Sequence, residues 1–140
     1  MVGYNLDKLD HMILKHLREN SRIPHTKIAD LLGISESTVR NRIEKMVNSG
    51  IIKRFTIETS EEGIKAIVLI EVSVATPSPQ IAEKISNMSG VEVVYETSGQ
   101  YDISAVISEP DIPSLNRSID QVRNLKGVTN TNSLIVLKSW

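Results

Sequence analysis

The most constraining stretch of the chain is 24–50, PHTKIADLLGISESTVRNRIEKMVNSG, in which two short apolar-periodic segments flank a single glycine. Gly33 lies where the first segment loses its periodicity, and glycine takes the left-handed conformation of a helix end without steric cost. Ser35 then occupies the N-cap position of a second helix. Glu36 lies in the first turn of that helix, where the helix dipole favours a carboxylate. The pattern predicts two helices joined by a tight turn, the helix-turn-helix arrangement.

Apolar residues recur at helical spacing through three consecutive segments of this N-terminal part. The segment from Leu6 to Glu19 precedes the other two, and Asn5 or Asp7 can serve as its N-cap. We expect the three helices to enclose one small core. Its expected members are Leu6, Leu9, Ile13, Leu14 and Leu17 from the first helix, Ile28, Ala29, Leu31 and Leu32 from the second, and Val39, Ile43, Met46 and Val47 from the third.

The outward face of the third helix determines what this part of the chain can contact. At about 100° per residue, that face carries Ser37, Asn41, Glu44 and Asn48, flanked by Thr38, Arg42 and Lys45 on one side and Arg40 on the other. Arginine pairs with guanine, asparagine with adenine, and hydroxyl groups bind phosphate. These residue types favour a helix that reads the DNA major groove over the plainer alternative, an amphipathic helix with a solvated charged face.

The composition excludes several protein classes. The chain has 140 residues, 40% hydrophobic and 24% charged, which is close to the average of soluble globular proteins and leaves room for one domain or two small ones. No apolar run approaches the roughly 20 residues of a membrane span, and the N-terminal MVGYNLDKLD shows no signal-peptide pattern. The absence of cysteine excludes disulfides, thiolate zinc sites and a cysteine nucleophile. These features fit a cytoplasmic protein.

Charge is distributed unevenly along the chain. Residues 1–59 carry 10 Lys and Arg against 7 Asp and Glu, a net charge of +3, and residues 60–140 carry 6 against 10, a net charge of −4. This asymmetry indicates that the N-terminal part alone faces a polyanion. Because an excess of three charges is modest, useful DNA affinity would need two or more copies of this domain acting together.

The character of the chain changes after Gly50. The β-rich run 51–57, IIKRFTI, is expected to form a short strand that brings Lys53 and Arg54 near DNA phosphates. A polar segment ending in glycine follows, and it predicts a hinge between two domains. The predicted organisation is a helix-turn-helix domain at 1–57, a linker at 58–64 and a second domain at 65–140.

The second domain is predicted to run strand, helix, strand, strand, helix, strand. This order is the split βαβ, or ferredoxin-like, arrangement, an α+β fold with both helices on one face of a four-stranded antiparallel sheet. The expected strands lie at 66–75, 91–97, 103–107 and 134–137, and a hairpin at 98–102 joins the second to the third. The first strand has one face formed by Val68, Ile70, Val72 and Val74. The first expected helix has the apolar residues Ile81, Ala82, Ile85 and Met88, and the second is capped by Asp111 and has the stripe Ile112, Leu115, Ile119, Val122 and Leu125.

The other face of that sheet has no cover within the chain, and it carries apolar residues such as Ile67 and Leu69. An exposed apolar sheet face indicates a partner, so we expect two chains to pack sheet to sheet. Such a homodimer would supply the second DNA-binding unit. Its two-fold symmetry favours a roughly palindromic site in double-stranded DNA.

Three motifs follow one another along the chain. The first is LDKLDHMILKHLREN, the second is IADLLGISESTVRNRIEKMVNSGIIKRFTI, and the third is a βαββαβ domain with GQYD between two strands. In this order the chain resembles, over nearly its whole length, the Lrp/AsnC (feast/famine) family of bacterial and archaeal transcriptional regulators. The resemblance implies a winged helix-turn-helix that binds DNA and a RAM/ACT-like C-terminal domain that forms dimers, assembled further into tetramers or octamers. It also implies a small effector, commonly an amino acid, bound between dimers.

The resemblance also implies particular site residues. On the DNA side these are Ser35, Ser37, Thr38, Arg40, Asn41 and Arg42, of which the outward face derived from periodicity independently selects Ser37, Thr38, Asn41 and Arg42. On the effector side they are Gly99, Gln100, Tyr101 and Asp102, with Thr129, Thr131 and Ser133 at the start of the last strand.

Both the DNA-side and the effector-side residues have a structural interpretation as well as a binding one. A carboxylate can take an α-ammonium group, and hairpin amides and hydroxyls can take an α-carboxylate. Gly99 and Asp102 are, however, also ordinary hairpin residues. Ser35 can serve purely as a helix cap. The sequence leaves these alternatives open.

Two other functions are compatible with parts of the pattern. Some proteins of this architecture resemble haem-pathway decarboxylases, which would need histidine in a C-terminal pocket, but His11, His16 and His25 all lie in the N-terminal part. No Ser/His/Asp set or metal-ligand spacing is present, so we predict neither an enzyme nor a metal or other cofactor. An architectural DNA-binding protein without an effector stays open, because shape readout leaves no simple motif.

Overall fold

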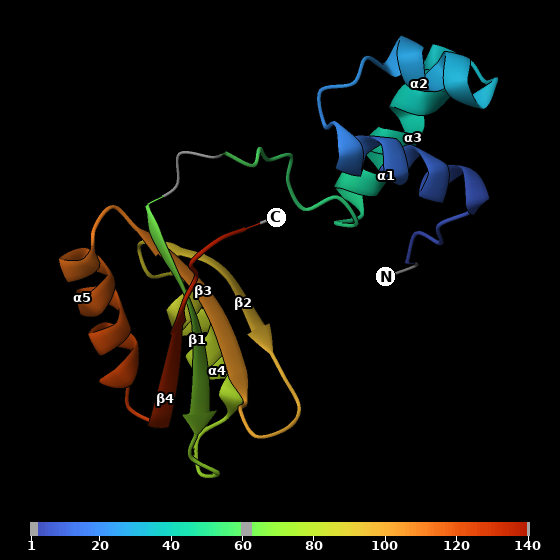
Figure 1. Ribbon diagram of the computed structural model, residues 1–140. Helices are drawn as coiled ribbons and strands as arrows, with labels where there is room; N and C mark the ends of the chain where they lie inside the picture. The colour runs from blue at the N-terminus through green and yellow to red at the C-terminus, as the bar shows by residue number, and fades with distance from the viewer. Residues whose placement is uncertain (1–2, 60–62, 140) are drawn as a thin grey trace. The chain divides into compact units, whose positions relative to one another are not determined.

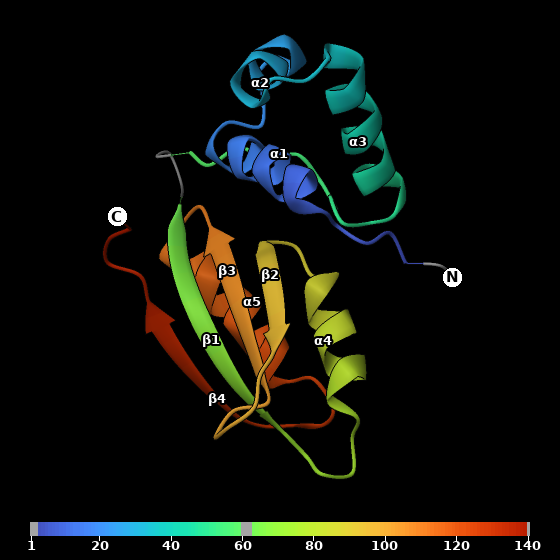
Figure 2. The same cartoon turned by 90° about the vertical axis from the view of Figure 1, so that its right-hand side faces the viewer.

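The computed structural model of the protein describes residues 3–59 and 63–139 (Figures 1 and 2). The chain divides into two compact units, Met1–Glu58 and Thr59–Trp140. Each unit has its own hydrophobic core. The division lies at the N-terminal end of the predicted linker, of which residues 60–62 lie outside the described residues.

The first unit consists of three helices around one core: α1 (Lys8–Glu19), α2 (His25–Leu32) and α3 (Glu36–Asn48). Asp7 is the N-cap of α1, so the structure selects it over Asn5. All three helices contribute to the core, which confirms the predicted arrangement. The buried apolar side chains are Ile13, Leu17, Ile28, Ala29, Val39, Ile43 and Met46.

Two residues expected in this core lie outside it. Leu31 is 54% exposed and Val47 is 41% exposed. At about 100° per residue, Val47 is turned by about 80° from Val39, which carries it from the buried stripe to the flank of α3. Leu31 is likewise turned by about 100° from Leu32, which packs against the core. The predicted stripes were therefore wider than the buried surface of each helix.

The short strand expected at 51–57 is not formed, because residues 51–59 contain no strand. A strand needs a neighbour for its backbone N–H and C=O groups, and the described part of the first unit contains no other strand. Phe55 and Ile57 are 53% and 74% exposed. Lys53 and Arg54 are exposed on the same segment.

The second unit is a four-stranded antiparallel sheet with two helices on one face (Figures 1 and 2). The strand order β2-β3-β1-β4 confirms the predicted ferredoxin-like α+β fold. The elements in chain order are β1 (Ile64–Val72), α4 (Ser78–Ser86), β2 (Val91–Glu96), β3 (Ile103–Glu109), α5 (Ile112–Arg123) and β4 (Val128–Ile135).

Alternation along the two central strands builds the core of this unit. Every second residue of β1 and of β3 points toward the helices, and those in the middle of β1 and in the first five residues of β3 are buried, which is the period of a strand with one covered face. The helices add one apolar stripe each. The buried residues are Ala66, Val68, Ile70, Ile103, Ala105 and Ile107 from the strands and Ile81, Ile85, Leu115, Ile119 and Val122 from the helices.

Several element boundaries differ from those expected. β1 ends at Val72, and Val74, expected on its buried face, is fully exposed in the turn beyond the strand. β4 spans Val128–Ile135 rather than 134–137, because its polar run TNTNS pairs with β1 without carrying an apolar signal. Ile112, expected in the buried stripe of α5, is 47% exposed at the first residue of that helix.

The face of the sheet opposite the helices carries several apolar residues, as predicted. Ile67 lies between Val106 of β3 and Leu134 of β4 in the sheet register. Since the alternate residues of β1 point to the helices, Ile67 and Leu69 point to the opposite face. Leu134 is 48% exposed there. Both α4 and α5 lie on the other side of the sheet (Figure 2).

Candidate DNA-binding helix and effector region

One glycine and one serine build the turn between α2 and α3. Gly33 has φ +67°, the left-handed conformation expected for it, and the N–H of Ile34 donates to the carbonyl of Ala29 at 3.1 Å. Ser35 is the N-cap of α3, because its Oγ accepts a hydrogen bond from the N–H of Thr38 at 3.2 Å. The predicted turn chemistry is confirmed, and it fixes where α3 begins.

Three hydroxyl groups gather at the N-terminal end of α3. Ser35 Oγ lies 3.0 Å from Ser37 Oγ and 2.7 Å from Thr38 Oγ1. Ser35 and Ser37 are exposed and Thr38 is half-buried. Ser35 therefore caps the helix and stays accessible at the same time. The positive end of the helix dipole lies at this cluster, which suits an anionic neighbour.

Further along α3, the outward face carries side chains that can read bases. Arg40 and Asn41 are exposed, and Arg40 forms an ion pair with Glu36 one turn earlier. An exposed pair of this kind contributes little to stability, so Arg40 can exchange Glu36 for another anion. Lys45 and Asn48 are exposed nearer the C-terminal end of the helix.

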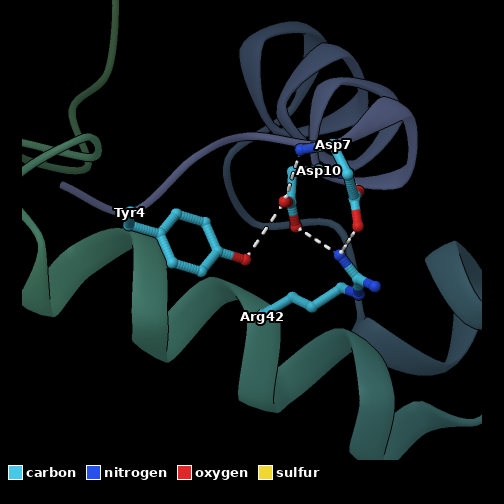
Figure 3. Close-up of polar contacts among 4 residues, drawn as sticks. All are labelled: Tyr4, Asp7, Asp10 and Arg42. Atoms are coloured by element: carbon cyan, nitrogen blue, oxygen red, sulfur yellow. Dashed lines mark hydrogen bonds and ion pairs between the residues drawn. The ribbon is translucent and has the colours of Figure 1, made fainter. Parts of the chain in front are cut away.

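Arg42 does not project outward as expected, but turns back toward α1 (Figure 3). Its Nη1 donates to Asp7 Oδ2 at 2.7 Å and to Asp10 Oδ1 at 2.8 Å. Asp10 is 1% exposed, and its Oδ2 accepts from the Tyr4 hydroxyl and the Asp7 N–H, each at 3.0 Å. Asp7 Oδ1 accepts from the Asp10 N–H at 2.9 Å. We call these four residues the Arg42 cluster.

The charges in the Arg42 cluster shift the pKa values of its members. The backbone N–H of Asp10 and the guanidinium of Arg42 lower the pKa of Asp7. Hydrogen bonds to Asp10 and Asp7 raise the pKa of Arg42 further above its usual value. Desolvation and the hydrogen bond to Asp10 raise the pKa of the Tyr4 hydroxyl. The cluster therefore favours charged Asp7 and Arg42 and a neutral Tyr4.

Sequence reasoning did not identify Asp10 or Tyr4 as site residues. Asp10 lies four residues after Leu6 and three before Ile13, which places it on the apolar stripe of α1. A carboxylate on a buried face is costly unless it is paired, so this position was the available signal for an ion pair with another helix. Tyr4 precedes α1 and carries no such signal.

One residue from each predicted part of the effector site contacts the carboxyl end of β1. In the hairpin between β2 and β3, the Asp102 N–H donates to the carbonyl of Ile70 at 2.9 Å, and Asp102 Oδ2 accepts from the Val72 N–H at 2.7 Å. On the other side of β1, Thr129 Oγ1 donates to the carbonyl of Glu71 at 3.1 Å. The structure therefore brings Asp102 and Thr129 to neighbouring positions of one strand end.

The tip of that hairpin is accessible. Gly99 and Gln100 are exposed, and Tyr101 is half-buried. Gly99 has φ +135°, a conformation that favours glycine. The carbonyl of Tyr101 accepts a hydrogen bond from Thr97 Oγ1 at 2.7 Å, which ties the tip to the end of β2. The hairpin thus has internal polar contacts and an open tip.

Thr131 and Ser133 lie on the helix-facing side of β4. They pair with Ile70 and Val68, which point into the core. Arg123 of α5 donates from Nε to Thr131 Oγ1 at 3.3 Å. Ser133 Oγ is buried and has no hydrogen-bond partner among the described residues. These two residues are therefore directed away from the open face of the sheet.

Two hollows in the structure are lined by none of the predicted site residues. One, of about 830 Å³, lies in the first unit between α1 and residues 51–58. The other, of about 400 Å³, is a shallow depression beside α4 and β2. Among residues 3–59 and 63–139, no group of three or more His, Asp or Glu side chains could hold a metal ion.

Comparison with known proteins shows the relatives of this chain. The winged helix-turn-helix DNA-binding family matches residues 6–53, and the Lrp/AsnC ligand-binding domain matches residues 65–140. The chain belongs to the Lrp/AsnC family. Over 141 residues it is 48% identical to the HTH-type transcriptional regulator LysM of Saccharolobus solfataricus, a match that covers 100% of this chain and 99% of that protein. LysM of Sulfurisphaera tokodaii is 49% identical over 137 residues, which cover 97% of this chain and 98% of that protein.

The fold agrees with that of a solved Lrp/AsnC protein. Escherichia coli AsnC superimposes with a TM-score of 0.74 at 28% sequence identity, and the match covers 97% of this chain and 95% of AsnC. The predicted resemblance is therefore confirmed over almost the whole length.

Family membership establishes the general function. The protein is a transcriptional regulator of the Lrp/AsnC type, with a DNA-binding helix-turn-helix and an effector-binding domain, and it is not an enzyme. The decarboxylase alternative is thereby excluded. None of the helices in the described parts of the chain has the length and apolar character needed to span a membrane.

Proposed function

We propose that this Lrp/AsnC regulator recognises a specific operator by placing α3 in the major groove of double-stranded DNA. The observation that carries the proposal is the exposed N-terminal half of α3, where Ser37, Arg40 and Asn41 lie on the surface. Residues near the start of a recognition helix are the ones that reach base edges. Arg40 suits guanine and Asn41 suits adenine, whereas Ser35, Ser37 and Thr38 suit phosphate oxygens.

Selection of binding sites from a randomised DNA library would test this proposal. We expect the unaltered protein to enrich a roughly palindromic sequence, because a two-fold dimer presents two copies of α3. Enrichment of no sequence, with equal affinity for all duplexes, would contradict sequence-specific reading and favour the architectural alternative.

A matched pair of substitutions on α3 tests which end of the helix reads the bases. Asn41→Ala should weaken binding to the selected duplex by about tenfold, the cost of one lost base contact. Asn48→Ala makes the same chemical change on an exposed residue at the C-terminal end of α3 and should have little effect. Fluorescence anisotropy with the selected duplex measures both. Equal effects of the two substitutions would contradict base reading by the N-terminal half of α3.

The proposed working unit is a homodimer formed sheet to sheet, with assembly to tetramers or octamers. The row of Val106, Ile67 and Leu134 on the open face of the sheet supports this, since a contiguous exposed apolar surface favours a partner. Pairing of two chains also compensates for the modest positive charge of the N-terminal part, because linked binding units gain avidity. We place this DNA-binding assembly in the cytoplasm.

We further propose an amino-acid effector that binds between dimers near the hairpin and the start of β4. The contacts of Asp102 and Thr129 with the end of β1 support a shared location, and Gly99 and Gln100 add an exposed tip. The Asp102 carboxylate suits an α-ammonium group, and hairpin amides suit an α-carboxylate. Thr131 and Ser133 fit less well, because they face the helices.

Thermal-shift screening of the unaltered protein against the twenty amino acids tests for the effector, since a ligand of the folded state raises the melting temperature. For any amino acid that gives a shift, Asp102→Asn should weaken binding at least about tenfold in calorimetry, because it removes the charge that the ammonium needs. Glu83→Gln, an exposed change on α4, is the control. An unchanged affinity of Asp102→Asn would remove Asp102 from the site.

A further inference from the structure

The Arg42 cluster is unusual because a cation of the recognition helix is held by two acidic residues of another helix (Figure 3). Asp7 and Asp10 stand at the beginning of α1, and Arg42 lies in the middle of α3. A single nitrogen, Nη1, makes both contacts, at 2.7 Å and 2.8 Å. The Arg42 side chain is 26% exposed. Its charge is therefore directed at α1.

The charge balance of the cluster disfavours a role in phosphate binding. Two carboxylates surround one guanidinium, so the local net charge is negative, and the carboxylate-bearing side chain of Asp7 is 54% exposed. A phosphate that approached Arg42 would also approach Asp7, and like charges repel. Lys45 and Arg40 are the more exposed cations of α3.

The desolvation cost of the ion pair between Asp10 and Arg42 also argues for a role other than stabilising the fold. Asp10 is almost completely buried, and for a buried ion pair the desolvation penalty can exceed the attraction between the charges. Such a pair is weak evidence for stability, but it has a fixed geometry. Here it joins α3 to the capped first turn of α1, and the two oxygens of Asp7 serve both the cap and Arg42.

We infer that Asp7, Asp10 and Arg42 are positioning residues that fix the orientation of α3 for sequence-specific reading, and that Arg42 does not contact DNA. Arg42 directly follows Asn41, so a fixed direction of the Arg42 side chain also fixes the direction in which Asn41 points. Tyr4 completes the cluster by donating to Asp10. This inference rests on the proposed function, in which α3 reads the bases.

The test compares affinities for two duplexes, the one selected by the unaltered protein and one of scrambled sequence, over a range of salt concentrations. The main variant is Asp7→Asn, which keeps a capping oxygen but turns an amide toward Arg42. Because Asp7 is an exposed residue and asparagine is a good N-cap, this variant should fold. We expect the ratio of specific to non-specific affinity to fall about tenfold, with an unchanged salt dependence.

The rival explanations give different results with the same variant. If Arg42 binds phosphate, removal of the Asp7 charge should strengthen binding to both duplexes and make the salt dependence steeper, since each phosphate contact adds about 0.9 to the slope. If the cluster is merely structural, the melting temperature should fall while the affinity ratio of the folded protein stays constant. Either result would overturn the inference.

Two further variants sharpen the test. The double variant Asp10→Asn/Arg42→Gln removes the buried carboxylate and its cationic partner together, which avoids an unpaired buried ion, and it should lower the ratio at least as far. Lys15→Gln, an exposed change on α1 outside the cluster, is the control and should leave the ratio unchanged, because a lysine away from α3 can at most contact phosphate, which carries no base information. An equal fall with Lys15→Gln would contradict the inference. A failure of the unaltered protein to select any sequence would instead overturn the proposed function and the inference with it.

Discussion

At the scale of single residues, Asp7 performs two tasks with one carboxylate: one oxygen caps α1 and the other holds Arg42. Both contacts lower its pKa in the folded protein. A carboxyl group with a lowered folded pKa stabilises the protein above its unfolded pKa, about 4. That stabilisation is lost as the pH falls through the folded pKa.

We therefore expect Asp7→Asn to melt at a lower temperature than the unaltered protein at pH 7, and the difference to shrink as the pH is lowered below about 4. Far-UV circular dichroism follows the melting. Asp30→Asn, an exposed change on α2, is the control and should show little difference at either pH. A difference for Asp7→Asn that stayed constant down to low pH would contradict the assignment.

Gly33 gives a second prediction at this scale. Its φ of +67° lies in the left-handed region, and a Cβ at this position would have open space around it. The cost of an alanine is therefore conformational rather than steric, and Gly33→Ala should lose about 1–2 kcal/mol of stability. Gly33→Asn should lose less, since asparagine tolerates this region better. Denaturant unfolding measures both, and an alanine as stable as glycine would argue against the observed turn.

At the scale of elements, the predicted apolar stripe of α5 contains both a buried and an exposed residue. Leu115 is 1% exposed, whereas Ile112 is 47% exposed. Leu115→Ala should cost about 2–5 kcal/mol, the range for a buried aliphatic side chain. Ile112→Ala should cost less than about 1 kcal/mol. Equal losses in denaturant unfolding would show that the stripe is buried evenly along the helix.

The helices were predictable from the sequence because their signals are local. Ser35, Gly33 and Asp111 each mark a helix end within a few residues, and the structure has all three in those roles. Strand limits depend on pairing between distant segments. β4 begins at Val128 because its polar residues pair with β1, and the run 51–57 forms no strand because no described strand lies beside it.

The same distinction applies to the candidate site. The cap role and exposure of Ser35 follow from local sequence, and the exposed positions of Ser37 and Asn41 follow from helical period. The inward turn of Arg42 depends on Asp7 and Asp10, which are 35 and 32 residues away in the sequence. Periodicity places a Cβ on a helix face, but a long side chain can reach a partner on another helix.

At the scale of the whole molecule, positive charge and apolar surface occur in different parts of the chain. The excess of +3 lies in residues 1–59, and the open apolar sheet face lies in the second unit. DNA binding and contact between chains therefore depend on different residues of the sequence. Substitutions on the sheet face should act on DNA binding through the number of linked α3 helices, not through the contacts of one helix.

Ile67→Glu tests this separation directly. Ile67 lies in the centre of the apolar row on the open face, so a dimer formed through this face would bury two like charges close together. We expect light scattering after size-exclusion chromatography to give the mass of the single 15.6 kDa chain. Affinity for the selected duplex should fall about 100-fold or more with the loss of avidity. Val74→Glu, the same change at a fully exposed turn residue, is the control. An unchanged mass for Ile67→Glu would place the interface elsewhere.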